Sequence, residues 1–164
     1  MTLGLDFVTR KFVASDGNEY QIKIWDTAGQ ERFKTLTYSF YKKADGVIMA
    51  FDTTDSKSFD NIKNWVDSIN QHAESGVPKI LVGNKIDLED DRQISEKQGR
   101  DLALKFGLNF YETSAKLNQG IKECMEDIFE QTINFKFKIQ NNLKKDRQSV
   151  VINQKDHSNA VNKR

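Results

Sequence analysis

Two short apolar runs, GVIMAFD at residues 46–52 and KILVGNKID at 79–87, constrain the fold of this chain more than any other feature. Continuous apolar strands of this length are typical of parallel sheets that are covered on both faces. Between the runs, apolar residues recur at spacings of three and four, which predicts an amphipathic helix. The pattern is therefore that of a strand, a helix and a strand in an α/β fold. The apolar helix positions are Phe59, Ile62, Val66 and Ile69, and the expected N-cap is Asp55.

The sequence on either side extends this pattern. Residues 5–12 and 18–25 are predicted strands, and SDGN between them favours a tight hairpin turn. Further on, Ser95 and Gln98 form a capping-box pattern at the start of another helix. A short strand within LNFYETSAK (108–116) precedes a last helix, whose apolar positions are Ile121, Met125, Ile128 and Phe129. We expect an α/β sheet with helices on both faces, which binds ligands beyond the carboxyl ends of its strands.

Composition and charge exclude several classes of function. In 164 residues, 25 Lys and Arg nearly balance 24 Asp and Glu, so no overall field favours nucleic acid or an anionic membrane. The single cysteine, Cys124, excludes an internal disulfide framework and is expected in the core, on the apolar stripe of the last helix. No apolar run reaches the roughly 18 to 20 residues that span a bilayer. We expect one soluble, cytoplasmic domain with no nucleic-acid partner.

The composition changes after about residue 137. The segment KIQNNLKKDRQSVVINQKDHSNAVNKR, at 138–164, is rich in Asn, Gln, Lys and Asp. It has too little apolar surface to offset the entropy of ordering. The expected boundaries are a folded domain at 1–137 and a disordered polar tail at 138–164.

Three polar clusters follow predicted strands, where such a sheet would bind its ligand. The first is DTAGQ, in which Asp26 could hold hydrated Mg²⁺ and Gly29 lets a backbone N–H approach an anion closely. Gln30 could orient a water molecule. A plain turn explains Asp and Gly in this cluster equally well.

The second and third clusters are NKID, after ILVG, and ETSAK, after LNFY. The Asp87 carboxylate can accept hydrogen bonds from the N1–H and the exocyclic amine of guanine, an edge that adenine does not offer. Lys85 could lie along the ring face, and the Ala115 N–H could reach a base oxygen where Ser114 shapes the turn. Taken alone, NKID is better explained as a solvated loop, and ETSAK as a turn or helix N-cap. All three clusters in this order, each after its own strand, favour a ligand site.

With these motifs the chain resembles a small GTPase of the Ras superfamily and, within it, the Rab family. The resemblance runs from residue 2 to about 137. TLGLDF resembles the effector loop and the strand after it, and SFDNIKNWVDSI resembles the third helix. WDTAGQERFKTLTYSFYKKADGVIMAFD resembles the second switch and the next strand. The resemblance implies a P-loop NTPase-like fold with a mostly parallel sheet.

The resemblance also implies ligands and the residues that hold them. Mg²⁺ would be bound by Thr2 and, through water, by Asp26. Gly29 would contact the γ-phosphate of GTP, and Gln30 would act as the catalytic residue that positions the attacking water. The guanine base of GTP or GDP would be held by Asn84, Lys85, Asp87, Ser114, Ala115 and Lys116.

By the same resemblance the function is a GTP/GDP switch that regulates vesicle-mediated transport at the cytoplasmic face of endomembranes. Effectors, exchange factors and activating proteins would read the two switch regions. Phe7, Trp25 and Tyr41 resemble the surface that engages effectors. Core packing explains Trp25 equally well.

Two features of the family are missing from the sequence. No glycine begins a G-x-x-x-x-G-K-S/T phosphate-binding loop, and no C-terminal cysteine offers a lipid acceptor. We expect a sequence that is shortened at the N-terminus and lacks the first strand, this loop and the first helix. That strand lies in the middle of the family's sheet, so its loss would expose strand edges. The alternative is a non-catalytic pseudo-GTPase module that binds effectors without turning over nucleotide.

Overall fold

Three parallel strands form the centre of the fold, as the two apolar runs predict. The computed structural model describes the backbone of residues 6–27 and 34–161, and the side chains of 7–27 and 38–142. The strand order in the sheet is β3–β4–β5. β4 is buried along its four middle residues, because it has a strand on each side and helices over both faces. The strands are β3 (Val47–Asp52), β4 (Lys79–Asn84) and β5 (Asn109–Thr113).

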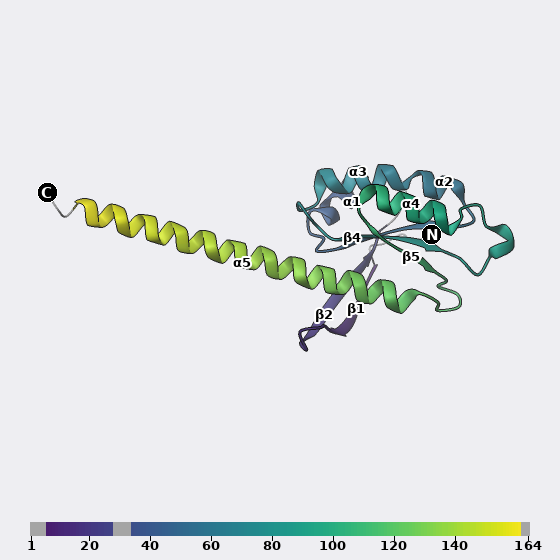
Figure 1. The fold of residues 1–164 in the computed structure, drawn as a ribbon, viewed down its shortest axis with the longest axis horizontal. Coiled ribbons are helices and arrows are strands. Elements are labelled where there is room, and N and C mark those ends of the chain that lie inside the picture. Colours follow the sequence, from purple (N-terminus) through teal and green to yellow (C-terminus); the bar gives the residue numbers. More distant parts are fainter. Residues whose placement is uncertain (1–5, 28–33, 162–164) are drawn as a thin grey trace.

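Helices cover both faces of this sheet (Figure 1). On one face, Met49 and Leu81 belong to a core cluster whose buried helical residues come from α1, α3 and α4. On the other face, Ile80 and Val82 pack with Cys124 of α5. The predicted α/β class and the core position of Cys124, which is 3% exposed, are confirmed. The first face carries α1 (Lys34–Tyr41), α2 (Ser56–Asp60), α3 (Ile62–His72) and α4 (Glu96–Phe106), and the second carries α5 (Ile121–Val161).

The helix predicted between the two apolar runs is two consecutive helices. Asp55 caps α2 as predicted, and its carboxylate accepts a hydrogen bond from the Lys57 N–H at 3.0 Å. Asn61 lies between α2 and α3 in right-handed helical geometry, so the apolar stripe continues across the junction. The capping box of α4, formed by Ser95 and Gln98, is confirmed.

The N-terminal strands form the predicted hairpin. β1 (Asp6–Val13) pairs antiparallel with β2 (Glu19–Asp26). Gly17 in the turn has a φ of 79°, which favours glycine, and Asp16 accepts a hydrogen bond from the Asn18 N–H. In the part of the chain that the structure describes, no strand joins this hairpin to β3. Residues 6–27 and 34–161 therefore form two sheets, where the resemblance implies one sheet with a further strand in its middle.

The hairpin packs against α5. Phe12 meets Phe129 edge-on, with ring centroids 5.3 Å apart. The Glu130 carboxylate accepts hydrogen bonds from both the N–H and the hydroxyl of Ser15, at 2.6 and 3.0 Å. α5 therefore helps to hold the hairpin beside the parallel sheet (Figure 1).

α5 continues as a helix to Val161, and its C-terminal part projects beyond the α/β body (Figure 1). The segment expected to be a disordered tail, 138–164, is thus helical in its backbone up to Val161. Its polar composition leaves little apolar surface to pack against the body, so the domain boundary at residue 137 stays a prediction. No helix among the described residues is long and apolar enough to cross a membrane.

Candidate functional site

Two of the three predicted clusters meet at one edge of the parallel sheet. β4 and β5 are neighbours, and the last residues of the two strands, Asn84 and Thr113, lie opposite each other in the register. Because parallel strands end at the same edge, the loops that follow them begin side by side. The backbone N–H of Ile86 donates to the carbonyl of Thr113 at 3.2 Å and ties the two loops together.

A side-chain hydrogen bond joins the acidic residue of one loop to the hydroxyl of the other. Ser114 Oγ donates to Asp87 Oδ1 at 2.5 Å and accepts from the Leu117 N–H at 3.0 Å. Ser114 is fully buried and Asp87 is partly exposed, so the bond joins the core to the surface of the loop. The Ser114 hydroxyl lowers the pKa of Asp87, which keeps the carboxylate ionised. An ionised Asp87 has a second oxygen that can accept further donors.

The amide of Asn84 links the same two loops. Its Oδ1 accepts hydrogen bonds from the Thr113 hydroxyl at 3.1 Å and from the Ala115 N–H at 3.2 Å. The sequence predicts that the Ala115 N–H reaches a base oxygen. In this structure it donates to Asn84. A ligand oxygen that used this N–H would compete with Asn84.

Lys85 has an unusual backbone and an ion pair. Its φ is 69°, a left-handed conformation that is strained for a residue with a side chain. Its Nζ lies 2.5 Å from Oδ2 of Asp52, the last residue of β3. Burial raises the pKa of Asp52, but the bonds from Lys85 and Thr54 outweigh it and hold that pKa below its ordinary value. The lysine expected along a ring face thus connects β3 to the loop after β4.

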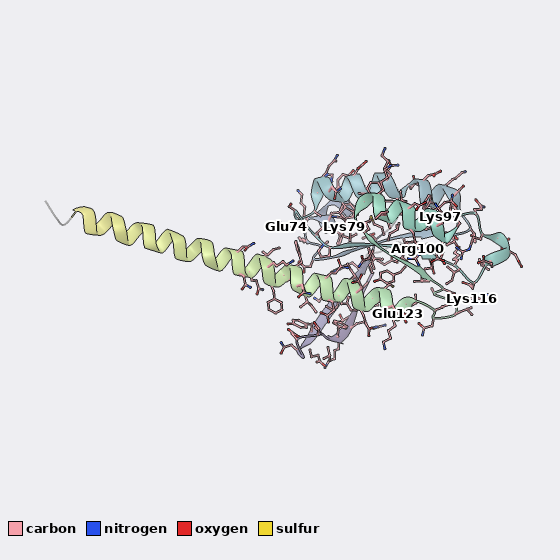
Figure 2. The ribbon with its side chains drawn as sticks, in the orientation of Figure 1. Glu74, Lys79, Lys97, Arg100, Lys116 and Glu123 are labelled. Atoms are coloured by element: carbon pink, nitrogen blue, oxygen red, sulfur yellow. The ribbon has the colours of Figure 1, made fainter. Side chains whose placement is uncertain are left out.

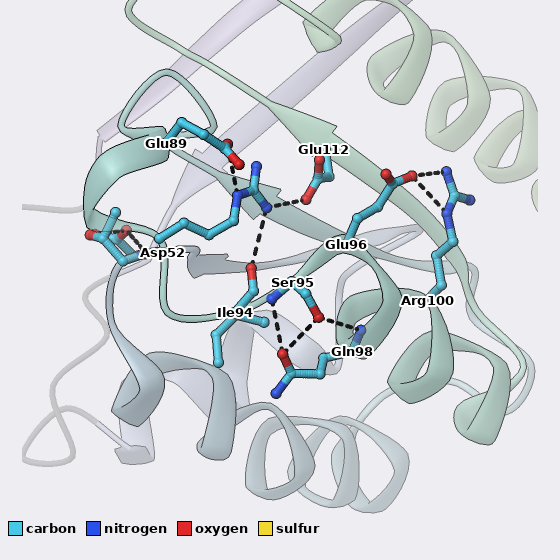
Figure 3. A network of polar contacts seen from close by, with 10 residues as sticks. Asp52, Glu89, Ile94, Ser95, Glu96, Gln98, Arg100 and Glu112 are labelled. Carbon is cyan, nitrogen blue, oxygen red and sulfur yellow. Dashed lines mark hydrogen bonds and ion pairs between the residues drawn. The ribbon is translucent and has the colours of Figure 1, made fainter.

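Sequence reasoning missed a further link, in which Arg92 joins Glu89 to Glu112, both labelled in Figure 3. Arg92 Nε donates to Glu89 Oε2 at 2.9 Å, and Nη1 donates to Glu112 Oε1 at 2.7 Å. Nη1 also donates to the Ile94 carbonyl at 3.2 Å. Glu112 lies twenty positions from Arg92, so no local pattern could have paired them. The bond to Glu112, followed by the bond to Glu89, raises the pKa of Arg92 despite its burial.

The remaining predicted site residues lie elsewhere. Asp26 is an exposed residue at the end of β2, in a different sheet from the two loops. Lys116 is exposed on the connection from β5 to α5 (Figure 2). Thr2, Gly29 and Gln30 are outside the described residues. The structure thus brings together Asn84, Lys85, Asp87, Ser114 and Ala115.

Aromatic side chains gather on the hairpin and α1. Phe7 and Trp25 stack at a tilt with ring centroids 4.8 Å apart, and both are nearly half exposed. Trp25 also lies 5.4 Å from the ring of Phe40. Tyr41, expected in an effector surface, is only 8% exposed, and burial raises its pKa to about 12. The residue of α1 at this surface is therefore Phe40 rather than Tyr41.

The carboxylate predicted to bind Mg²⁺ is Asp26, at the end of β2. Asp26 is a hard oxygen ligand of the kind that Mg²⁺ prefers, and Asp6 lies opposite it in the hairpin register. No group of three or more His, Cys, Asp or Glu residues that could hold a metal occurs within 6–27 and 34–161. Mg²⁺ in nucleotide sites usually has one or two carboxylates and completes its shell with phosphate oxygens and water. An exposed Asp26 fits that pattern.

The chain is similar in sequence to a known protein family. A family model described as the Ras family matches residues 1–134. The Ras-related protein Rab-8B of Homo sapiens is 47% identical over 123 residues, which are 75% of this chain and 59% of that protein. Rab-8A of Bos taurus and Rab-8A of Mus musculus are 47% and 46% identical over the same length. The chain thus spans 59% of the length of these curated relatives.

Proposed function

This chain belongs to the Ras family, in its Rab branch of small GTPases, and on that premise we propose that it recognises the guanine base of GTP and GDP through the loops after β4 and β5. The observation that carries the proposal is the hydrogen bond between Ser114 Oγ and Asp87 Oδ1. It brings an ionised acceptor to the edge of the sheet where ligands bind in α/β folds.

The chemistry of the site favours guanine over adenine. The second oxygen of Asp87 can accept from the N1–H and the exocyclic amine of guanine, whereas adenine has an acceptor at N1 and no amine at C2. The amide nitrogen of Asn84 is available as a donor to the base, because its oxygen is directed to Thr113 and Ala115. Lys116 adds a positive charge that also lowers the pKa of Asp87, after the larger effect of Ser114.

The phosphate end of the nucleotide would be held by residues of the first cluster and the N-terminus. Asp26 and Thr2 would hold Mg²⁺, which supplies charge neutralisation for the phosphates. Gly29 would contact the terminal phosphate, and Gln30 would orient the attacking water for hydrolysis. Loss of the terminal phosphate would release both switch segments.

The cellular role that we propose is the one typical of Rab proteins. A GTP/GDP switch would regulate vesicle-mediated transport from the cytoplasmic face of endomembranes. Effectors, exchange factors and activating proteins would read the aromatic surface formed by Phe7, Trp25 and Phe40. These three side chains form a contiguous group with centroid separations of 4.8 and 5.4 Å, which supports a protein-binding role.

The test of base recognition is a titration of the isotope-labelled chain with GDP and with ADP, followed by amide NMR. This method measures dissociation constants into the millimolar range, so it does not need tight binding. We expect GDP to bind at least about tenfold more tightly than ADP, since one charge-assisted hydrogen bond contributes at least about 1.4 kcal/mol. Equal affinities would refute the proposal.

The matched variants are Asp87→Ala and Asp101→Ala. Asp87→Ala should abolish the preference for GDP. Asp101 is an exposed carboxylate of α4 that pairs with Lys97 at 2.8 Å, away from both loops, so its removal should leave the preference intact. A folded Asp87→Ala chain that still prefers GDP would contradict the role of Asp87.

The alternative, a module that binds effectors without a nucleotide switch, is favoured by the exposed aromatic surface. Fluorescence of Trp25 separates the two, once Trp65→Phe has removed the other tryptophan. A switch predicts different Trp25 emission with saturating GDP and with a non-hydrolysable GTP analogue. The module predicts the same emission with both.

A further inference from the structure

We propose that Arg92 is a positioning residue for base selection, which holds the Asp87 loop and the Ser114 loop at the separation that a guanine base requires. The inference rests on the proposed guanine recognition. It concerns a residue that does not itself contact the base.

The position of Arg92 in the fold is the first argument. The loop after β4 continues from Asp87 into the short 3₁₀ helix η2 (Glu89–Asp91), and Arg92 follows it directly. Glu112 is the residue of β5 that comes just before Thr113 and Ser114. The guanidinium therefore connects the segment after one base-binding loop to the strand end before the other, as Figure 3 shows.

The anchoring of Arg92 is the second argument. The N–H groups of Gln93 and Ile94 both donate to the Thr53 carbonyl, at 2.8 and 3.0 Å. Arg92 itself donates to the Ile94 carbonyl, and its side chain is only 16% exposed. The backbone next to Arg92 and its guanidinium are thus held by the protein independently of Glu112. Arg92 can therefore restrain the position of Glu112. A planar guanidinium with several donors suits this role better than a single ammonium.

The third argument comes from the other links between the loops. The Ala115 N–H, bonded to Asn84, is the donor that a base oxygen would use. Asp87, bonded to Ser114, is the acceptor that the base would use. The Asn84 link therefore shares its donor with the ligand and must adjust when a base binds, whereas Asp87 would meet the base with the oxygen that Ser114 does not use. The link from Arg92 to Glu112 shares none of these atoms, and neither does the backbone bond from Ile86 to Thr113, so among the side-chain links Arg92 can keep the loops in place while Asn84 adjusts.

The test compares binding of GDP with binding of IDP, which lacks only the exocyclic amine. Asp87 would accept a hydrogen bond from that amine. In the unmodified chain we expect a preference for GDP of roughly 10- to 100-fold, the range for one charge-assisted hydrogen bond. Arg92→Gln should reduce this ratio at least about fivefold. General destabilisation of the fold would lower the affinity for GDP and for IDP by the same factor and leave their ratio unchanged. The ratio therefore separates a positioning role from an effect on stability.

Two further variants complete the experiment. Arg100→Gln removes another arginine, whose exposed pair with Glu96 lies on α4, and should keep the full ratio. Arg92→Lys should keep part of the ratio that Arg92→Gln loses, because lysine keeps the positive charge but not the planar guanidinium with several donors. If Arg92→Gln does not fold, Glu112→Gln breaks the same link from the other side and should lower the ratio in the same direction.

The outcomes are distinct for the two proposals. A folded Arg92→Gln or Glu112→Gln chain that keeps the full ratio of GDP to IDP overturns the role of Arg92 and leaves guanine recognition standing. An unmodified chain that does not distinguish GDP from ADP overturns both proposals. A lower ratio in Arg100→Gln as well would also refute the specific role of Arg92.

Discussion

The parallel sheet and the N-terminal hairpin differ in how much of their apolar surface is buried. In the parallel sheet, Ile80 and Leu81 are completely inaccessible, because helices cover both faces. In the hairpin, one face packs on α5 while Phe7, Trp25 and Val13 are 44 to 64% exposed. The proposed base site lies on loops at the end of the buried sheet, and the proposed protein-binding surface lies on the half-exposed hairpin.

The two regions also differ in how they are held together. The loops after β4 and β5 are joined by several short hydrogen bonds within one sheet edge. The hairpin is joined to α5 by the Ser15 bonds to Glu130, which lies 115 positions away in the sequence, and by edge-on aromatic contacts. A base site needs fixed distances between its donors and acceptors, whereas a surface that reports a switch must be able to move.

The largest expected difference between the regions is in the cost of losing an apolar side chain. Leu81→Ala should lower the free energy of unfolding by about 2 to 5 kcal/mol, since it leaves a cavity in a fully buried strand. Val13→Ala in the hairpin should change it by less than about 0.5 kcal/mol, because Val13 is 64% exposed. Urea denaturation of both variants measures the two values. Equal costs would mean that the parallel sheet is not the main core.

Two glycines with positive φ sharpen the comparison. A Cβ at Gly120, where φ is 67°, would lie 2.2 Å from the Glu112 carbonyl oxygen, so Gly120→Ala should cost about 2 to 4 kcal/mol. A Cβ at Gly17, where φ is 79°, would meet nothing within 4 Å, so Gly17→Ala should cost only about 1 kcal/mol for the backbone conformation. Thermal unfolding of the two variants tests this ranking. The reverse order would contradict the close approach of Gly120 to β5.

A smaller effect is expected from the link between the hairpin and α5. Glu130→Gln removes the charge from the acceptor of two Ser15 hydrogen bonds and should cost about 1 kcal/mol or less. Hydrogen exchange should accelerate in β1 and β2 and stay unchanged in β4. The control is Glu126→Gln, since Glu126 faces Lys122 of its own helix at 3.9 Å. Uniform acceleration across both sheets would mean that the hairpin and the parallel sheet unfold as one unit.

The smallest effect is the response to acid. The pKa values of Asp52 and Asp87 lie below 3.8 in the folded protein, for Asp52 because Lys85 and Thr54 outweigh burial and for Asp87 because of Ser114. A carboxyl group whose pKa is lower in the folded state stabilises the native state above pH 3.8. This stabilisation is lost as the pH falls through the folded pKa. Unfolding free energy should therefore decrease below pH 3.8, and Asp52→Asn should decrease less steeply. A variant that keeps the original slope would show that the pair with Lys85 does not contribute.

Much of the fold followed from local patterns. The apolar runs predicted β3 and β4, and the Asp55 cap and the Ser95–Gln98 capping box were identified from residues a few positions apart. The division of one predicted helix into α2 and α3 was missed, because Asn61 keeps helical geometry and does not interrupt the apolar period. Topology predicted that three polar clusters share a ligand site, and the structure brings NKID and ETSAK together at one sheet edge. The use of the Ala115 N–H by Asn84 was not predicted. Which acceptor a backbone N–H uses depends on the tertiary structure, because the acceptor must lie within hydrogen-bond distance.

The amino-acid sequence by itself determined the α/β class, the buried strands, the hairpin turn and the two polar clusters at neighbouring strand ends. Each of these depends on period, turn chemistry or residue type, which act over a few positions. Only the tertiary structure decided that the hairpin forms its own sheet against α5, that Lys85 pairs with Asp52, and that Arg92 joins Glu89 to Glu112. These contacts are selected by packing and by the distance between charges, which are set only when remote segments are brought together.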